Sequence, residues 1–203
     1  MIASPRNEGN EIDMTREHNP RVNDQAIIEE IRQLDKEAIK VAVTDIDGVL
    51  RGKYLHKDKF LSAIEAGFGF CNVVFGWDSA DVCYNNSVYT GWHTGYPDAL
   101  ARIDLRTFRR VPWDHQIPFF LADFEDNQGR PLEICPRQLL KRVLERAKDA
   151  GFLVRTGMEF EWFNFRETPQ TLADKQHTSP SPLTPGMFGY SLLRSSLQNS
   201  FFN

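Results

Sequence analysis

One short run, residues 157–165, places the strongest constraint on how this chain can fold. It sets two glutamates, Glu159 and Glu161, among large apolar and aromatic side chains. Successive side chains of a β-strand point to opposite faces, so a strand here carries both glutamates on one face, about 7 Å apart. Large apolar groups then lie on both faces. The run therefore predicts a strand that is covered on both sides.

Two carboxylates held close together away from water repel each other and are costly to ionise. A divalent cation removes this cost, and Mg²⁺ takes oxygen ligands of this type. The spacing therefore indicates Glu159 and Glu161 as metal ligands. The alternative interpretation is a strand whose glutamate face meets water and holds no ion.

Composition restricts the class of protein. With 203 residues, of which 41% are hydrophobic, the chain can bury a sizeable core in one large or two small domains. It has 24 basic and 28 acidic residues, which gives no electrostatic support for a nucleic-acid surface. No apolar run reaches the length of a membrane span, so neither nucleic acid nor a membrane is an expected partner.

The cysteines and the start of the chain indicate a cellular compartment. Cys71, Cys83 and Cys135 are an odd number without close spacing, which favours free or buried thiols in a reducing compartment. Residues 1–24 are polar and lack the apolar stretch of a secretory signal. We therefore expect a flexible leader over residues 1–24 and a cytoplasmic protein.

Residues 25–134 read as an α+β unit of several strands with one or two helices. Asp47 and Gly48 separate the first two strand patterns and predict a hairpin with a type I′ turn, which needs positive φ at both central positions. A long loop over residues 76–98 is a candidate functional segment, because long loops in compact domains are often functional. The pattern predicts helices over residues 24–34 and 57–66 and strands over residues 41–46, 49–55, 73–75, 101–105 and 119–124.

Pro136 opens a further helix that ends at Gly151. Its apolar stripe is expected to face inward and its charges to lie on a solvated outer face. The stripe comprises Leu139, Leu140, Val143, Leu144 and Ala147, and the charges are Arg137, Lys141, Arg142 and Lys148. After the glutamate strand we expect a loop over residues 168–186 and a helix from residue 190. The apolar last residues suggest that the sequence is truncated.

Five segments, in this order, resemble the glutamine synthetase superfamily. Residues 44–53 resemble its opening strands, and residues 75–78 resemble the segment with an active-site aspartate. Residues 121–137 resemble the end of its β-grasp domain and the next helix. Residues 157–163 look like its Gly-x-Glu-x-Glu-Phe metal motif, and residues 189–203 look like the stretch that follows.

This resemblance, which covers roughly residues 38–203, implies a fold and a chemistry. A β-grasp domain over residues 25–134 would be followed by the start of a catalytic α/β domain over residues 135–203. Family members use ATP to convert the γ-carboxylate of glutamate into γ-glutamyl phosphate, and ammonia or an amine then displaces phosphate. Divalent ions, Mg²⁺ or Mn²⁺, neutralise charge on the transferring phosphoryl group.

The resemblance also implies roles for three residues. Glu159 and Glu161 would each bind one of two metal ions, and Asp78 would bind or deprotonate the incoming ammonium or amine. In the family this aspartate reaches the active site of a neighbouring subunit, so a homo-oligomer with shared sites is expected. The other metal, nucleotide and glutamate ligands of the family lie further along than residue 203, so this chain alone is expected to be inactive.

Two alternatives stay open. The form of residues 47–53 is closer to the γ-glutamyl-amine ligase branch. The tryptophan that accompanies the aspartate in many glutamine synthetases has no obvious counterpart after Asp78. The substrate could then be a polyamine or another amine instead of ammonia. The second alternative is a short, non-catalytic protein that binds partners through its β-grasp surface.

Overall fold

The computed structural model describes residues 20–184, 186 and 189–202, and its contacts divide the chain into two compact units, Met1–Val154 and Arg155–Asn203. The expected boundary between residues 134 and 135 concerns the domains of the family and stays a prediction. In the first unit the elements are α1 (Pro20–Arg32), β1 (Ala38–Thr44), β2 (Leu50–His56), α2 (Lys57–Ala66), β3 (Phe68–Cys71), the 3₁₀ helix η1 (Asn72–Phe75), β4 (Asp98–Val111), β5 (Ile117–Glu125) and α3 (Pro136–Asp149). The second unit contains α4 (Pro169–Asp174), α5 (Leu192–Ser196) and α6 (Asn199–Phe202).

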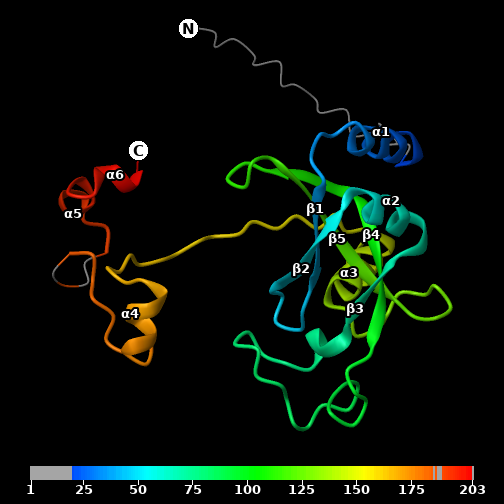
Figure 1. Ribbon diagram of the computed structural model, residues 1–203. Helices are drawn as coiled ribbons and strands as arrows, with labels where there is room; N and C mark the ends of the chain where they lie inside the picture. The colour runs from blue at the N-terminus through cyan, green and yellow to red at the C-terminus, as the bar shows by residue number, and fades with distance from the viewer. Residues whose placement is uncertain (1–19, 185, 187–188, 203) are drawn as a thin grey trace, which may run out of the picture. The chain divides into compact units, whose positions relative to one another are not determined.

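A mixed five-stranded sheet forms the framework of the first unit (Figure 1). Its strand order is β2-β1-β5-β4-β3. The central strands β1 and β5 are parallel, and the other neighbouring pairs are antiparallel. The sheet with its helices confirms the expected combination of strands and helices in this part of the chain.

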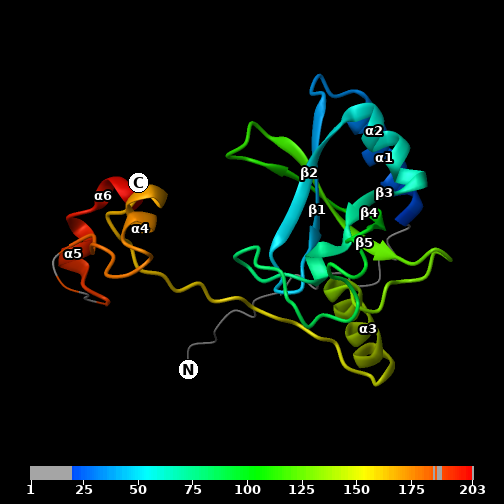
Figure 2. The ribbon, with the colours of Figure 1, turned by 60° about the horizontal axis from the view of Figure 1, so that its bottom comes forward.

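Helices α1 and α2 lie together against one face of this sheet (Figures 1 and 2). Ile31 of α1 and Phe60 of α2 are completely buried, together with Phe120 and Phe124 of β5. The rings of Phe60 and Phe120 are 4.7 Å apart. Burial of such aromatic side chains is the main favourable term that holds the helices to the sheet.

The start of α1 corrects one expectation. The helix begins at Pro20, so residues 20–24 are helical where a flexible segment was expected. Proline suits the first turn of a helix, because its missing N–H has no partner there in any case. The remainder of the expected leader, residues 1–19, lies outside the described residues.

The expected orientation of α3 is wrong. Along β5, Phe120 and Phe124 point into the core, so Asp123 points to the opposite face. Arg137 and Lys141 of α3 both contact Asp123 there, although they were expected on a solvated face. The side chains of the apolar stripe are instead 40–57% exposed at Leu139, Leu140, Val143 and Leu144. A buried carboxylate without a cation is costly, and this cost orients the helix.

The first hairpin is confirmed, but its turn differs from the expected type. Thr44 pairs with Leu50, so five residues connect β1 to β2. Gly48 has a φ of 82°, whereas Asp47 is not among the residues with positive φ. A type I′ turn needs positive φ at both positions, so this turn belongs to another class. The strand expected over residues 73–75 is likewise wrong, because these residues belong to the 3₁₀ helix η1.

In the second unit, residues 157–164 form no strand, and both Glu159 and Glu161 are exposed. A strand requires a neighbouring backbone for its hydrogen bonds. Among the described residues, the β-pairing next to this segment is a single isolated bridge between Phe165 and Pro182. The expected loop contains the short helix α4, and the helical pattern from residue 190 divides into α5 and α6.

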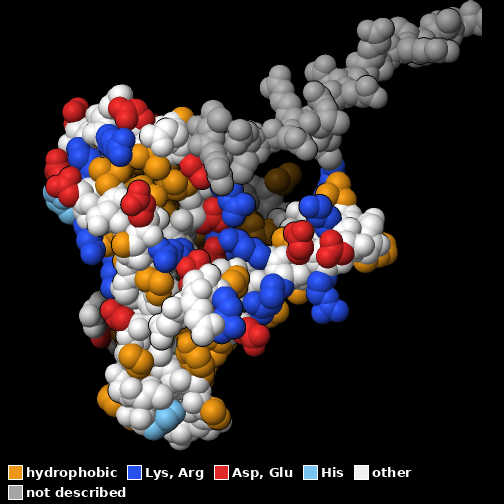
Figure 3. Space-filling model, turned by 90° about the vertical axis from the view of Figure 1, so that its right-hand side faces the viewer, with side chains coloured by type: hydrophobic (Ala, Val, Ile, Leu, Met, Phe, Trp, Pro, Cys, Tyr) orange, Lys and Arg blue, Asp and Glu red, His pale blue; other side chains and the backbone are white. Residues whose placement is uncertain are grey.

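Charges of both signs occur over the face of the molecule in Figure 3, as the nearly balanced composition leads one to expect. Of the helices in the described part of the chain, none is both long and apolar enough to span a membrane.

Candidate active site

The long loop between η1 and β4 carries Asp78, and several contacts hold it in place. The N–H of Asn72 donates to the carbonyl oxygen of Pro97 at 3.0 Å, which ties the two ends of the loop together. Thr90 is completely buried, and its hydroxyl donates to the Asn72 side chain at 2.5 Å. The ring of Tyr89 packs edge-on against Phe75, with centroids 5.8 Å apart. The loop is therefore irregular, as expected, and at the same time anchored.

Within this loop, Asp78 opens a tight turn and is held by that turn. Its Oδ1 accepts hydrogen bonds from the N–H groups of Ala80 at 2.9 Å and Val82 at 3.0 Å. The N–H of Asp78 donates to the carbonyl oxygen of Val82 at 3.1 Å. Aspartate favours turns of this kind, because its short side chain reaches its own backbone. No partner contacts its Oδ2 among the described residues, so this oxygen is available to a ligand.

Arg51 of β2 links the first hairpin to this turn. Its Nε lies 2.7 Å from Oδ2 of Asp45, a completely buried carboxylate, and this hydrogen bond is the main cause of the raised pKa of Arg51. One Nη donates to Asp81 at 2.5 Å, and the other lies 3.4 Å from the carbonyl oxygen of Asp78. The guanidinium also stacks over Trp77, 4.7 Å from the ring centre.

The hairpin and the loop together gather negative charge. The pKa of Tyr84 is raised, first by burial and then by the charges of Asp47, Asp78 and Asp45. Of these three carboxylates, Asp45 is neutralised by Arg51. A site with an excess of carboxylates favours a cation such as ammonium or a protonated amine over an anion.

Glu159 and Glu161 lie in the second unit, and each is exposed. Within the described residues neither carboxylate has a hydrogen-bond or ion-pair partner, and no group of three or more His, Cys, Asp or Glu side chains is arranged so that it could hold a metal ion. Their oxygens are the hard donors that Mg²⁺ and Mn²⁺ take, but two residues are too few to fill the coordination of such an ion. The donor type fits a divalent ion, and further ligands have to come from elsewhere.

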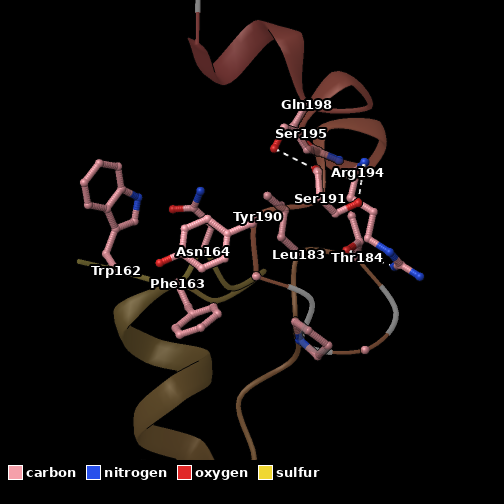
Figure 4. Close-up of a pocket in the computed structure, with 13 residues that line it drawn as sticks. Trp162, Phe163, Asn164, Leu183, Thr184, Tyr190, Ser191, Arg194, Ser195 and Gln198 are labelled. Carbon is pink, nitrogen blue, oxygen red and sulfur yellow. Dashed lines mark hydrogen bonds between the residues drawn. The ribbon is translucent and has the colours of Figure 1, made fainter. Parts of the chain in front are cut away.

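A cavity of about 280 Å³ lies wholly within the second unit. The first residue of its lining is Trp162, which follows Glu161 in the chain. Figure 4 shows the side chains of Trp162, Asn164 and Tyr190 around it. The cavity lining is apolar, aromatic and neutral polar, apart from Arg194. One Nη of Arg194 donates to the Thr184 hydroxyl at 3.2 Å.

Sequence reasoning proposed Asp78 as a site residue but did not point to the residues that contact its turn. Asp45 and Arg51 are six positions apart, on either side of the hairpin turn, and this spacing brings them into contact. A buried aspartate followed across a turn by an arginine is a detectable signal. The contact of Arg51 with Asp81 spans 30 positions and needs the tertiary fold.

A scan of protein-family models gives no match to this chain. Several curated proteins are similar to it. A type-1 glutamine synthetase 2 of Dictyostelium discoideum is 50% identical over 87% of this chain and 34% of its own length. A glutamate–isopropylamine ligase of a Pseudomonas species is 34% identical over 79% of this chain and 35% of its own length. A gamma-glutamylethanolamide synthetase of Streptomyces coelicolor is 30% identical over 82% of this chain and 37% of its own length.

The chain spans about a third of the length of these curated relatives. The resemblance seen in the sequence covers roughly residues 38–203 and includes the segments around Asp78 and Glu159. The chain is therefore a homologue of the glutamine synthetase family, which here includes glutamate–amine ligases, at up to 50% identity over most of its residues.

Proposed function

We propose that the whole protein is an ATP-dependent ligase that joins the γ-carboxylate of glutamate to ammonia or an amine. The observation that carries the proposal is the 50% identity to a type-1 glutamine synthetase over 87% of this chain. In such a reaction ATP phosphorylates glutamate to γ-glutamyl phosphate, and the nitrogen nucleophile then displaces phosphate. An uncharged amine attacks, so the ammonium form must first lose a proton.

Asp78 is suited to this proton transfer. Its turn holds one carboxylate oxygen and leaves Oδ2 without a partner in the described residues. A carboxylate stabilises an ammonium ion before attack and accepts a proton during it. The surrounding negative charge adds to the attraction. We propose that Asp78 binds the amine and that, in a homo-oligomer, it serves the active site of a neighbouring subunit.

Glu159 and Glu161 are proposed as two of the metal ligands, one for each of two divalent ions. Mg²⁺ or Mn²⁺ bound there would neutralise charge on the phosphoryl group during its transfer. The other ligands would come from outside the described residues. We expect residues 1–203 alone not to turn over, because these two carboxylates are an incomplete set.

For the fold we infer a β-grasp domain over residues 25–134, followed by the start of the catalytic domain over residues 135–203. The central parallel pair β1 and β5 and the helix α2 packed across them support this inference. A cytoplasmic location is proposed from the free thiols of Cys71, Cys83 and Cys135, which fit a reducing compartment.

An amine ligase is the second candidate function. It is favoured by the 34% and 30% identities to proteins described as a glutamate–isopropylamine ligase and a gamma-glutamylethanolamide synthetase. The two candidates differ in the nucleophile and share the activation of glutamate.

The test is an assay of the whole protein with glutamate, ATP and Mg²⁺. Ammonium, isopropylamine, ethanolamine and a polyamine are supplied in turn, and both phosphate and the γ-glutamyl amide are measured. We expect amide formation that requires ATP and glutamate, and the ratio of kcat/KM values for the nucleophiles separates the two candidates. Absence of amide with every nucleophile would contradict both and would favour a non-catalytic binding protein.

A further inference from the structure

We propose that Arg51 is a positioning residue that places the Asp78 carboxylate for the amine. The proposal rests on the proposed function, in which Asp78 acts on the nucleophile. Arg51 has no contact with the Asp78 carboxylate in the structure, and its action is on the backbone that carries it.

The Nε side of the Arg51 guanidinium is held by Asp45, next to the end of β1. Asp45 is completely buried at the end of β1, and its Oδ1 accepts hydrogen bonds from the N–H groups of Asp47 at 3.0 Å and Val49 at 2.8 Å. These bonds leave its Oδ2 for the Nε of Arg51 at 2.7 Å. The guanidinium is therefore held by a carboxylate that cannot move without disturbing the hairpin.

The two Nη atoms of the same guanidinium contact the turn of Asp78. The guanidinium contacts the side chain of Asp81 and the carbonyl oxygen of Asp78, and the N–H of Asp81 donates to the same carbonyl oxygen at 3.1 Å. The guanidinium also lies over the ring of Trp77, 4.7 Å from its centre. Three contacts thus connect one planar group to a short segment. Lysine cannot reproduce them, because its ammonium is a point charge without a planar fork.

The arrangement also keeps the positive charge of Arg51 apart from the carboxylate of Asp78. Arg51 pairs with the carboxylates of Asp45 and Asp81 and contacts Asp78 only through its backbone. The positive charge of Arg51 is therefore balanced by other carboxylates and not by Oδ2 of Asp78. That oxygen keeps its negative charge available for a cationic amine.

The experiment uses Arg51→Lys and Asp81→Asn in the whole protein. Asp81 is 58% exposed in its side chain, so its substitution removes one contact without opening the core. The matched control is Arg102→Lys, because the Nε of Arg102 lies 2.8 Å from Glu125 on the sheet, in a similar ion pair away from the loop. For each variant, kcat and KM are measured for the amine, ATP and glutamate.

We expect kcat/KM for the amine to fall by about 10- to 100-fold in Arg51→Lys, the range that a small misplacement of a catalytic group produces. Asp81→Asn should show a smaller loss. KM for ATP and glutamate should stay unchanged, and Arg102→Lys should leave all these constants unchanged. In an Asp78→Asn background, Arg51→Lys should cause little further loss, since both act on one group. Unchanged amine kinetics, or fully additive losses, would overturn the proposal.

A second readout does not need turnover. Hydrogen exchange at the N–H groups of Ala80 and Val82, which donate to Asp78, should quicken in Arg51→Lys and Asp81→Asn and stay unchanged in Arg102→Lys. Unaltered exchange would overturn the role of Arg51 even in an active enzyme. If the unmodified protein forms no amide, the proposed function is wrong, and the exchange rates alone decide whether Arg51 holds the turn.

Discussion

Arg137 of α3 donates a hydrogen bond to the buried carboxylate of Asp123 in β5 at 2.6 Å. The same guanidinium reaches Asp104 of β4 at 2.9 Å, and Lys141 lies 2.5 Å from Asp123. Burial alone would raise the pKa of Asp104, but hydrogen bonds from Arg106 and Arg137 and the charge of Lys141 outweigh burial and lower it. Helix α3 is thus attached to the sheet by charges, and its apolar stripe is exposed.

Substituting Arg137 by Met should therefore destabilise the first unit by about 3 kcal/mol, because two carboxylates that are less than 10% exposed lose a cation. Urea denaturation followed by circular dichroism measures this change. The control is Arg130→Met, because Arg130 is 69% exposed and pairs with Asp126 at 2.7 Å. An exposed pair contributes at most about 1 kcal/mol. Equal destabilisation by both substitutions would show that burial of the charges does not matter.

The second unit should show an acid transition at Glu167. Hydrogen bonds from Lys175 first, and then from the N–H of Ser181, lower the pKa of Glu167 from 4.5 to about 2. A lowered pKa in the folded state means that the carboxylate stabilises the fold above pH 4.5 and that this contribution disappears as the pH falls towards 2.

Nuclear magnetic resonance can follow the Glu167 side chain and the Ser181 N–H during an acid titration. Both signals should report a midpoint well below that of an exposed glutamate, and Glu167→Gln should remove the transition. An ordinary midpoint at Glu167 would contradict the contacts with Lys175 and Ser181.

Replacement of Asp78 by Asn keeps the shape of the side chain and removes its charge and proton acceptor. Turnover of the whole protein at saturating amine should fall by about 10²-fold or more, as expected for loss of an acid–base group. ATP affinity should be unaffected, because the proposed role concerns only the amine. Unimpaired turnover would assign Asp78 to the structure of its loop.

Glu159→Gln and Glu161→Gln test the metal ligands. Titration calorimetry of the whole protein with Mn²⁺ should show weaker binding in each variant. Thermal denaturation should show that saturating metal stabilises each variant less than the unmodified protein. Stability without metal should change by no more than about 0.5 kcal/mol, because both side chains are exposed. Glu145→Gln, at another exposed glutamate, is the control. Metal affinity equal to that of the unmodified protein in both variants would remove these residues from the site.

Local patterns in the sequence predicted much of the first unit. The period of apolar residues identified α1, α2 and α3, and Gly67 and Gly151 end two of these helices with positive φ. Asp47 and Gly48 predicted the hairpin, and the order of motifs predicted the family of the homologues. These features depend on residues close to one another in the chain, so the sequence contains their cause.

Other features depend on contacts between distant residues. The stripe of Leu140 and Val143 has the period of a buried helix face, yet the pairing of Arg137 with Asp104, 33 positions away, turns that face outward. Residues 157–164 have the alternation of a strand, but a strand forms only where a second backbone supplies its hydrogen bonds. The sequence by itself determined the local helices, the hairpin and the loop of Asp78. Only the tertiary structure decided the side of α3 that faces the sheet and the guanidinium that holds Asp78, because burial of a charge depends on what packs against it.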